Sequence, residues 1–298
     1  MNPGVIYAAL AYGIWGLFPL YFRQLADVPA LEVIMHRTVW SLGFVLLLLL
    51  ALRRWAWIRE VAHQPRVLGA FAVSALLLSG NWLTYVWSVQ NAHVLDASLG
   101  YFILPLVNVA LGFVFLRERP RRGQWLAVGI ASAGVLWLAV QAGHVPWIAL
   151  ILAITFGIYG LLRKIAVLGA LEGLALETAL LAPLAILYMV WDAWQGHGVF
   201  VQSGHTTVAW LMLAGPLTAI PLLLFAAGAR RIPMTLLGIL QYLSPTLLFL
   251  LSTLVFDEPM QSARLVGFAL IWAALLVYSL ENWRFNRRNK SPKTTTDR

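Results

Sequence analysis

Ten apolar segments divide the sequence, and their length limits what the chain can become. Each is close to the ~20 residues that an α-helix needs to cross a hydrocarbon core of about 30 Å. Inside a bilayer only helices and closed barrels satisfy their own backbone hydrogen bonds, and segments of this length favour helices. The segments span residues 4–22, 33–52, 68–90, 97–116, 124–141, 146–163, 174–192, 208–226, 235–255 and 264–282. The sequence therefore predicts an all-α membrane protein with ten transmembrane helices.

The composition excludes several other classes of protein. Hydrophobic residues make up 61% of the chain and charged residues only 11%, which does not suit a water-soluble surface. The net charge of +9 comes from short loops and a tail, so it indicates membrane topology rather than nucleic-acid binding. The chain has no cysteine, no Walker A motif and no compact catalytic or metal-ligating set. We therefore expect no catalytic residues, no metal, no cofactor and no enzymatic activity.

The basic residues are divided unevenly between the two sides of the predicted bundle. Of the 21 Lys and Arg residues, 18 follow the second, fourth, sixth and eighth segments or lie in the C-terminal tail. The loops on the other side hold only Arg23 and Arg264, and Arg37 lies within a segment. By the positive-inside rule, both termini are predicted to be cytoplasmic.

A sequence pattern recurs at a fixed offset of 140 residues. Matched pairs keep their place relative to a long apolar run: Pro105 and Pro245, Phe102 and Tyr242, and Glu118 and Glu258. Each copy contains an odd number of segments, so the two copies must cross the membrane in opposite senses. The predicted units are a first five-helix repeat at 1–143, a second, inverted repeat at 144–283 and a basic, disordered cytoplasmic tail at 284–298.

Three ionisable residues lie near the start of the second segment. Glu32 and His36 are four residues apart and share a helix face, with Arg37 about 100° further round. Such groups are costly in a bilayer and therefore face the bundle interior or a wet cavity. The cluster could bind an anionic group or pass a proton, since histidine titrates near neutral pH. It could equally hold helices together by mutual pairing, and both interpretations stay open.

The third segment carries a stripe of hydrogen-bonding side chains. Asn81, Tyr85 and Ser88 follow the spacing of one helix face, and Trp82 lies beside them. Small-molecule sites combine apolar and aromatic walls with a few placed polar groups, so this stripe is a candidate cavity wall. The alternative is interhelical packing through amide hydrogen bonds.

Each predicted repeat has a proline inside an equivalent apolar segment, Pro105 in the first and Pro245 in the second. Pro105 lies between Tyr101 and Asn108 on one face of the fourth segment. Proline removes a backbone donor and frees a carbonyl, which a membrane tolerates only where protein or water covers it. We therefore place this face, and its counterpart at Gln241 and Pro245, at the centre of the molecule, with both prolines as hinges.

The same offset places Arg37 on Glu177. In an inverted repeat these two residues lie near opposite sides of the membrane. We expect each to close a gate on its own side by pairing with an opposite charge or a helix terminus. Together with Glu32 and His36 they form the predicted gating and coupling group, and a static ion pair is the alternative for each.

Several of these motifs occur together in one known family. They are Gly13–Gly16, Glu32, His36–Arg37, Gly80–Trp82, Ala97–Phe102, Pro105–Asn108, Gln241–Tyr242 and Pro245–Thr246. The chain thereby resembles the EamA-type members of the drug/metabolite transporter superfamily, and within it the RarD-like group, over residues 4–282. The resemblance implies a multi-pass carrier of the bacterial inner membrane, built from two inverted five-helix repeats. It also implies a central cavity lined chiefly by helices 1, 3, 4, 6, 8 and 9.

The expected substrate-binding residues are Trp15, Asn81, Trp82, Tyr85, Tyr101, Asn108, Gln241 and Tyr242. The predicted function is a secondary transporter that exports small amphipathic metabolites or drugs by alternating access. The name of the group is linked to chloramphenicol sensitivity, but the resemblance does not supply the cargo. A non-transporting membrane subunit and an intramembrane enzyme are the alternatives. The expected partners are a small-molecule substrate and the lipid bilayer, with monomer and homodimer both open.

Overall fold

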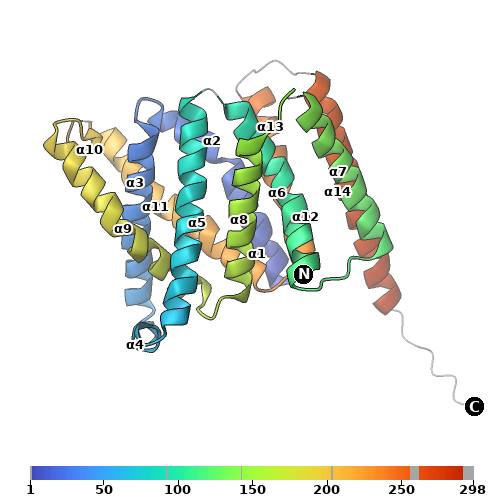
Figure 1. The fold of residues 1–298 in the computed structure, drawn as a ribbon, viewed down its shortest axis with the longest axis horizontal. Coiled ribbons are helices and arrows are strands. Elements are labelled where there is room, and N and C mark those ends of the chain that lie inside the picture. Colours follow the sequence, from blue (N-terminus) through green and yellow to red (C-terminus); the bar gives the residue numbers. More distant parts are fainter. Residues whose placement is uncertain (1, 92, 142, 203, 256–261, 291–298) are drawn as a thin grey trace, which may run out of the picture.

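The computed structural model describes residues 2–91, 93–141, 143–202, 204–255 and 262–290 (Figure 1). All regular secondary structure in these residues is helical, and they contain no strand. Ten helices in the described part are long and apolar enough to cross a membrane, which confirms the predicted fold class. Glu258 of the second predicted repeat lies outside the described residues.

The ten long helical segments of the described chain are joined by short loops and two small helices, α4 and α10. In chain order the elements are α1 (Pro3–Gly16), α2 (Phe18–Phe22), η1 (Arg23–Leu25), α3 (Ala30–Ala51), α4 (Trp57–Ala62), α5 (Pro65–Gln90), α6 (Val94–Phe115), α7 (Arg122–Gln141), α8 (Trp147–Ile165), α9 (Ala170–Trp194), α10 (Val199–Gln202), α11 (His205–Ala229), α12 (Met234–Gln241), α13 (Leu243–Leu254) and α14 (Ser262–Lys290).

The last helix corrects the predicted start of the tail. We expected disorder from residue 284, whereas α14 continues to Lys290. Residues 284–290 contain neither glycine nor proline, so nothing in their backbone chemistry ends the helix there. The remaining tail, 291–298, lies outside the described residues.

Two of the membrane-spanning segments are broken, each just before a proline. The first breaks at Leu17 between α1 and α2, and the ninth breaks at Tyr242 between α12 and α13. Proline cannot donate to the carbonyl four residues earlier, so Pro19 leaves the Trp15 carbonyl without its helical partner. Pro245 does the same to Gln241. Pro105, Pro183, Pro216 and Pro221 lie inside helices that stay continuous, so a proline permits a break at these two places without enforcing one.

Spans that lie five positions apart in the chain make equivalent helix contacts. The first span (α1) packs on α11 and α13, and the sixth (α8) packs on α5 and α6. The second and seventh spans, α3 and α9, pack on each other, as do α7 and α14 at one end of the molecule (Figure 1). Close approach needs small residues: a Cβ on Gly238 of α12 would lie 2.6 Å from the Pro105 carbonyl oxygen of α6.

The bundle has two faces that differ in charge. We call the side with residues 52–64, 116–121, 166–169 and 230–233 the basic face, because most loop arginines lie there. The other side, with residues 26–29, 143–146 and 195–198, is the opposite face.

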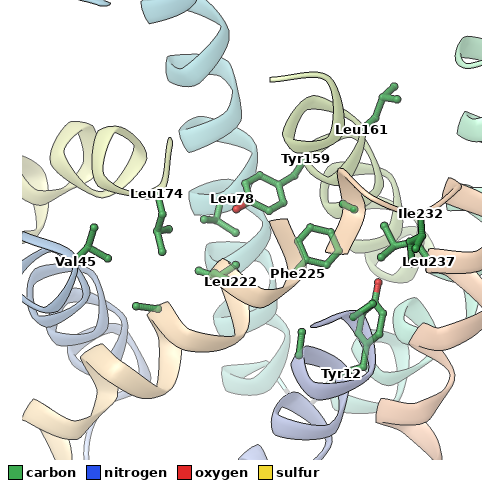
Figure 2. Close-up of a cluster of buried hydrophobic side chains, with 14 of the residues drawn as sticks. Tyr12, Val45, Leu78, Tyr159, Leu161, Leu174, Leu222, Phe225, Ile232 and Leu237 are labelled. Atoms are coloured by element: carbon green, nitrogen blue, oxygen red, sulfur yellow. The ribbon is translucent and has the colours of Figure 1, made fainter. Parts of the chain in front are cut away.

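A core of buried side chains fills the bundle toward the basic face. Tyr12, Tyr159, Phe225, Met234 and Leu237, which we call the plug, come from α1, α8, α11 and α12 and are at most 1% exposed. Figure 2 labels Tyr12, Tyr159, Phe225 and Leu237 of the plug. The rings of Tyr159 and Phe225 are stacked with centroids 6.1 Å apart. Phe225 also meets Tyr12 at 6.2 Å. These contacts join both halves of the chain across the centre of the molecule.

Candidate functional site

A central cavity of about 200 Å³ lies next to the plug. Side chains of α1, α2, α3, α5, α6, α8, α11, α12 and α13 line it. These elements include all six helices that the family resemblance implied, together with α3. The aromatic lining residues are Tyr12, Trp15, Phe18, Phe22, Trp82, Tyr85, Tyr101 and Phe156, and the other polar or charged ones are Arg37, Asn81, Gln241 and Ser244.

The cavity is displaced toward the opposite face. Its lining residues lie at the end of α1, in the last third of α5 and in the first halves of α3, α6 and α8. All of these parts are the ends nearer to the opposite face. The plug occupies the other half of the same axis, so the site is closed toward the basic face.

Six of the eight predicted substrate-binding residues line this cavity: Trp15, Asn81, Trp82, Tyr85, Tyr101 and Gln241. Trp15 packs edge-on against Phe156, with centroids 5.7 Å apart. Tyr85 and Tyr101 meet edge to face at 6.5 Å across α5 and α6. The walls are therefore aromatic surfaces held by neighbouring rings, which suit a flat apolar ligand.

The other two predicted residues lie behind the wall. The Asn108 side-chain nitrogen donates to the Gln241 side-chain oxygen at 2.9 Å, and Asn108 is 1% exposed. Tyr242 is fully buried, and its hydroxyl donates to the Phe102 carbonyl oxygen at 3.3 Å. In this conformation Asn108 supports the lining residue Gln241, Tyr242 connects the end of α12 to α6, and neither residue lines the cavity.

Hydrogen bonds hold the polar lining residues in place. The Asn81 side-chain nitrogen donates to the Leu152 carbonyl oxygen and to the Thr155 hydroxyl, each at 2.9 Å. The Ser244 hydroxyl donates to the Tyr12 carbonyl oxygen at 2.6 Å and so ties α13 to α1 beside the helix break. Polar groups anchored in this way are preorganised and lose little entropy when a ligand binds.

The predicted gating residues are distributed over three places. Arg37 lies in the cavity wall, where its Nε donates to the Thr218 hydroxyl at 2.9 Å. Glu32 is buried near α10 and accepts a hydrogen bond from the Val199 backbone nitrogen at 3.1 Å. His36 is also buried. The Glu32 carboxylate and the Arg37 guanidinium therefore have separate partners, and the two groups do not form one cluster.

Glu177 lies near the basic face, away from the cavity. Its carboxylate is 3.7 Å from the Arg163 guanidinium, and it accepts hydrogen bonds from Ser74 at 2.5 Å and Tyr159 at 3.3 Å. Tyr159 belongs to the plug, so this buried carboxylate is connected to the closed half of the bundle. Of the two predicted hinges, Pro245 lines the cavity, and Pro105 packs against Gly238.

Sequence reasoning missed the residues Phe18, Phe22 and Phe156 of the cavity wall. The repeat contained a usable signal for Phe156. Gly157–Gly160 matches Gly13–Gly16 once a loop-length difference of four residues is added to the offset of 140, and this match places Phe156 on Tyr12. Phe18 and Phe22 gave no such signal, because their orientation depends on the break before α2.

Comparisons with known proteins agree with this architecture. Residues 2–140 match the model of the EamA-like transporter family. The chain is 48% identical to an uncharacterized transporter of Pseudomonas aeruginosa, with 98% of each chain covered. It is 42% identical to Protein RarD of Escherichia coli, covering 96% of each. A second Pseudomonas aeruginosa relative, named Chloramphenicol-sensitive protein RarD, is 33% identical over 96% of each chain.

A solved crystal structure shares the fold. It superposes with a TM-score of 0.70 at 19% sequence identity and covers 94% of this chain and 98% of its own. The near-complete coverage by the relatives includes the plug, both helix breaks and every wall of the cavity. The chain therefore belongs to the EamA-like transporter family.

Proposed function

We propose that the protein is a secondary transporter that moves small amphipathic solutes through the central cavity by alternating access. The observation that carries this proposal is an aromatic cavity that lies nearer to the opposite face and is separated from the basic face by the plug. Relatives named as transporters support the coarse function. A structural membrane subunit would have no need for a preorganised cavity in its centre, and no catalytic role is proposed for any residue.

The closed side is held by polar contacts as well as by the plug. Glu118, from the loop after α6, accepts hydrogen bonds from the backbone nitrogens of Met234 and Thr235 at 2.7 and 3.0 Å. Lys164 donates to the carbonyl oxygens at the end of α11, including Ala229 at 2.9 Å. Helix termini favour charges of these signs, so the contacts stabilise the closed arrangement without being covalent or permanent.

The helix breaks supply places where the bundle can bend. α1 and α2 meet at Leu17, α12 and α13 meet at Tyr242, and both breaks border the cavity. Discontinuous helices at a central site are a recurring feature of secondary transporters. Bending there would move the cavity walls without unpacking α7 and α14, which contact each other at the edge of the molecule.

An inverted repeat and cytoplasmic termini complete the proposal. The equivalent contacts of helices five spans apart support the inverted repeat. The 18 basic residues on one side support the cytoplasmic termini. In this orientation the basic face is cytoplasmic and the structure is closed toward the cytoplasm. We further propose the bacterial inner membrane as the location, since the relatives compared are bacterial, and export as the direction.

The size of the cavity bears on the cargo. Sites for drug-sized ligands measure roughly 300–1,000 Å³. The cavity here, at about 200 Å³, favours a metabolite with one ring over a larger drug. A chloramphenicol-sized solute would need the cavity to widen during the cycle.

Single cysteines introduced into this cysteine-free chain test the proposal. Tyr101→Cys lies in the cavity, Leu237→Cys lies in the plug, and Leu136→Cys lies on the outer surface of α7, where Leu136 is 65% exposed. A charged, membrane-impermeant thiol reagent is applied to either side of proteoliposomes. We expect Tyr101→Cys to react from one side and Leu237→Cys to react slowly from the other, while lipid protects Leu136→Cys.

Two results would contradict the proposal. If Tyr101→Cys is as unreactive as Leu136→Cys, water does not reach the cavity. If Tyr101→Cys reacts but Leu237→Cys stays inert from both sides under all solute gradients, the plug is static and alternating access does not occur. Counterflow of a radiolabelled solute in the same vesicles gives the direction and rate of transport.

A further inference from the structure

Arg37 is the one charged side chain among the described residues that line the central cavity. A guanidinium in the membrane interior is costly unless an anion or several acceptors surround it. The ion pairs formed within the described residues involve Arg54, Arg121, Arg163 and two histidines, and none involves Arg37. Within the part of the chain that the structure describes, its positive charge is therefore not balanced by a carboxylate.

The contacts of Arg37 orient its guanidinium. Its Nε donates to Thr218, and its central carbon lies 4.9 Å from the Trp82 ring centroid and 5.7 Å from those of Phe18 and Phe22. Aromatic faces stabilise a cation but accept no in-plane hydrogen bonds. A guanidinium has five N–H donors, and the bond to Thr218 uses the one on Nε. The Nη1 and Nη2 edge is the part that forms bidentate pairs with carboxylates.

The ligand class follows from the charges and the size of the cavity. Its described lining contains no Asp or Glu, so the negative charge that Arg37 lacks has to come from the ligand. One guanidinium balances one negative charge, which favours a carboxylate over a phosphate monoester carrying about −1.5 to −2 at pH 7. The remaining wall is aromatic, and the volume of about 200 Å³ suits a single ring.

We propose that the central cavity binds a small aromatic monocarboxylate, with the carboxylate paired to Arg37 and the ring packed against Trp15 and Phe156. This inference rests on the proposed transport function and names its substrate class. The described lining residues offer an ammonium group no carboxylate partner, so an aromatic zwitterion or amine binds less well than the corresponding acid.

Binding to the purified full-length protein, measured by isothermal titration calorimetry, tests this inference. The probes are phenylacetate, its neutral amide phenylacetamide, the cation phenethylamine and the zwitterion phenylalanine. We expect phenylacetate to bind at least about tenfold more tightly than phenylacetamide, because a hydrogen-bonded charge pair replaces a neutral contact. Arg37→Gln should remove this preference, and Arg37→Lys should retain part of it, because lysine keeps the charge but not the bidentate geometry.

Arg231→Gln is the matched control, because Arg231 also lies over an aromatic ring, Tyr7 at 5.3 Å, but outside the cavity. It should leave the preference for phenylacetate unchanged. If Arg37→Gln does not fold, the wild-type order of the four probes still decides the question.

The inference is overturned if phenylacetate and phenylacetamide bind equally, if no probe binds, or if folded Arg37→Gln keeps the full preference. These results leave the transport proposal to its own test. Unequal reactivity of Tyr101→Cys and Leu237→Cys from the two sides would show alternating access with a different cargo, whereas an inert plug would remove the transport cycle itself.

Discussion

The Tyr242 hydroxyl donates a hydrogen bond of 3.3 Å to the carbonyl oxygen of Phe102, the residue 140 positions earlier. The sequence repeat has the same offset, so these are equivalent residues of the two predicted repeats. A residue contacts its own equivalent only where it lies close to the axis that relates the two copies. The contact therefore supports a pseudo-two-fold axis between α6 and α12, next to the cavity.

The neighbouring pair follows the same relation. Tyr101 and Gln241 are equivalent at this offset, both line the cavity, and each precedes a proline by four residues. Their carbonyl groups consequently lack the helical donor that another residue would supply. The same local arrangement, a lining residue four positions before a proline, therefore occurs in both repeats. It places the Tyr101 ring in one part of the cavity wall and the Gln241 amide in another.

We predict that Asn108 and Gln241 are energetically coupled. Asn108→Leu leaves the buried Gln241 amide without its 2.9 Å partner, which costs about 1–3 kcal/mol for an unsatisfied polar group. The double variant Asn108→Leu/Gln241→Leu removes both groups and should cost less than the two single variants together. Thermal unfolding of all three proteins in one detergent measures the coupling. Strictly additive losses would show that the hydrogen bond contributes nothing.

We predict that both ends of the chain lie in the cytoplasm. Green fluorescent protein fused after Arg288 should fluoresce, whereas alkaline phosphatase at the same position should be inactive, because it folds only in the periplasm. The matched position is Gly143, on the opposite face, where the two reporters should give the reverse result. A phosphatase active after Arg288 would invert the proposed orientation and make the plug a periplasmic seal.

The sequence predicted the helices well because membrane crossing depends on length and hydrophobicity, which are local properties. The cavity-facing stripe of Asn81 and Tyr85 was recognisable for a similar reason, since helical spacing alone puts both residues on one face. Gln241 was recognisable through the repeat and its nearby proline. In each case the informative pattern lies within one segment or between two equivalent segments.

Tertiary contacts were the part that the sequence could not supply. Arg163 is one of the 18 basic residues that the charge count assigned to loops and tail on one side, but it lies in the last turn of α8 and is 1% exposed beside Glu177. Arg37 was expected to pair with a carboxylate or a helix terminus, and its contacts are instead a hydroxyl and three rings. The residues that contact Arg163 and Arg37 in this way come from other helices, so no spacing rule along one helix identifies them.

We predict that the Arg163–Glu177 pair contributes both to stability and to closure. Glu177→Leu leaves the Arg163 guanidinium buried without its carboxylate, at a cost of about 3–5 kcal/mol. Arg163→Leu/Glu177→Leu should recover most of the thermal stability, because no lone charge remains. If the pair is part of the gate, both variants raise the reactivity of Leu237→Cys. A purely static pair would change the unfolding temperature alone and leave that reactivity at the wild-type level.

Glu118 offers the sharpest test of closure at the basic face. Its two carboxylate oxygens accept hydrogen bonds from the Met234 and Thr235 backbone nitrogens and from the Thr235 hydroxyl, at the start of α12. Removing a helix cap costs about 0.5–2 kcal/mol. Because this cap connects the loop after α6 to α12, its loss should weaken the closed state more than the fold.

We therefore expect Glu118→Ala to increase the reactivity of Leu237→Cys from the basic face by about two- to thirtyfold, since each 1.4 kcal/mol changes a conformational equilibrium tenfold. Glu118→Gln, which keeps one acceptor but loses the charge, should give an intermediate increase. The matched control is Glu60→Gln on α4, an exposed carboxylate on the same face, which should have no effect. Equal reactivity in Glu118→Ala and wild type would mean that the contact caps a helix without holding the gate, and that the plug alone closes the basic face.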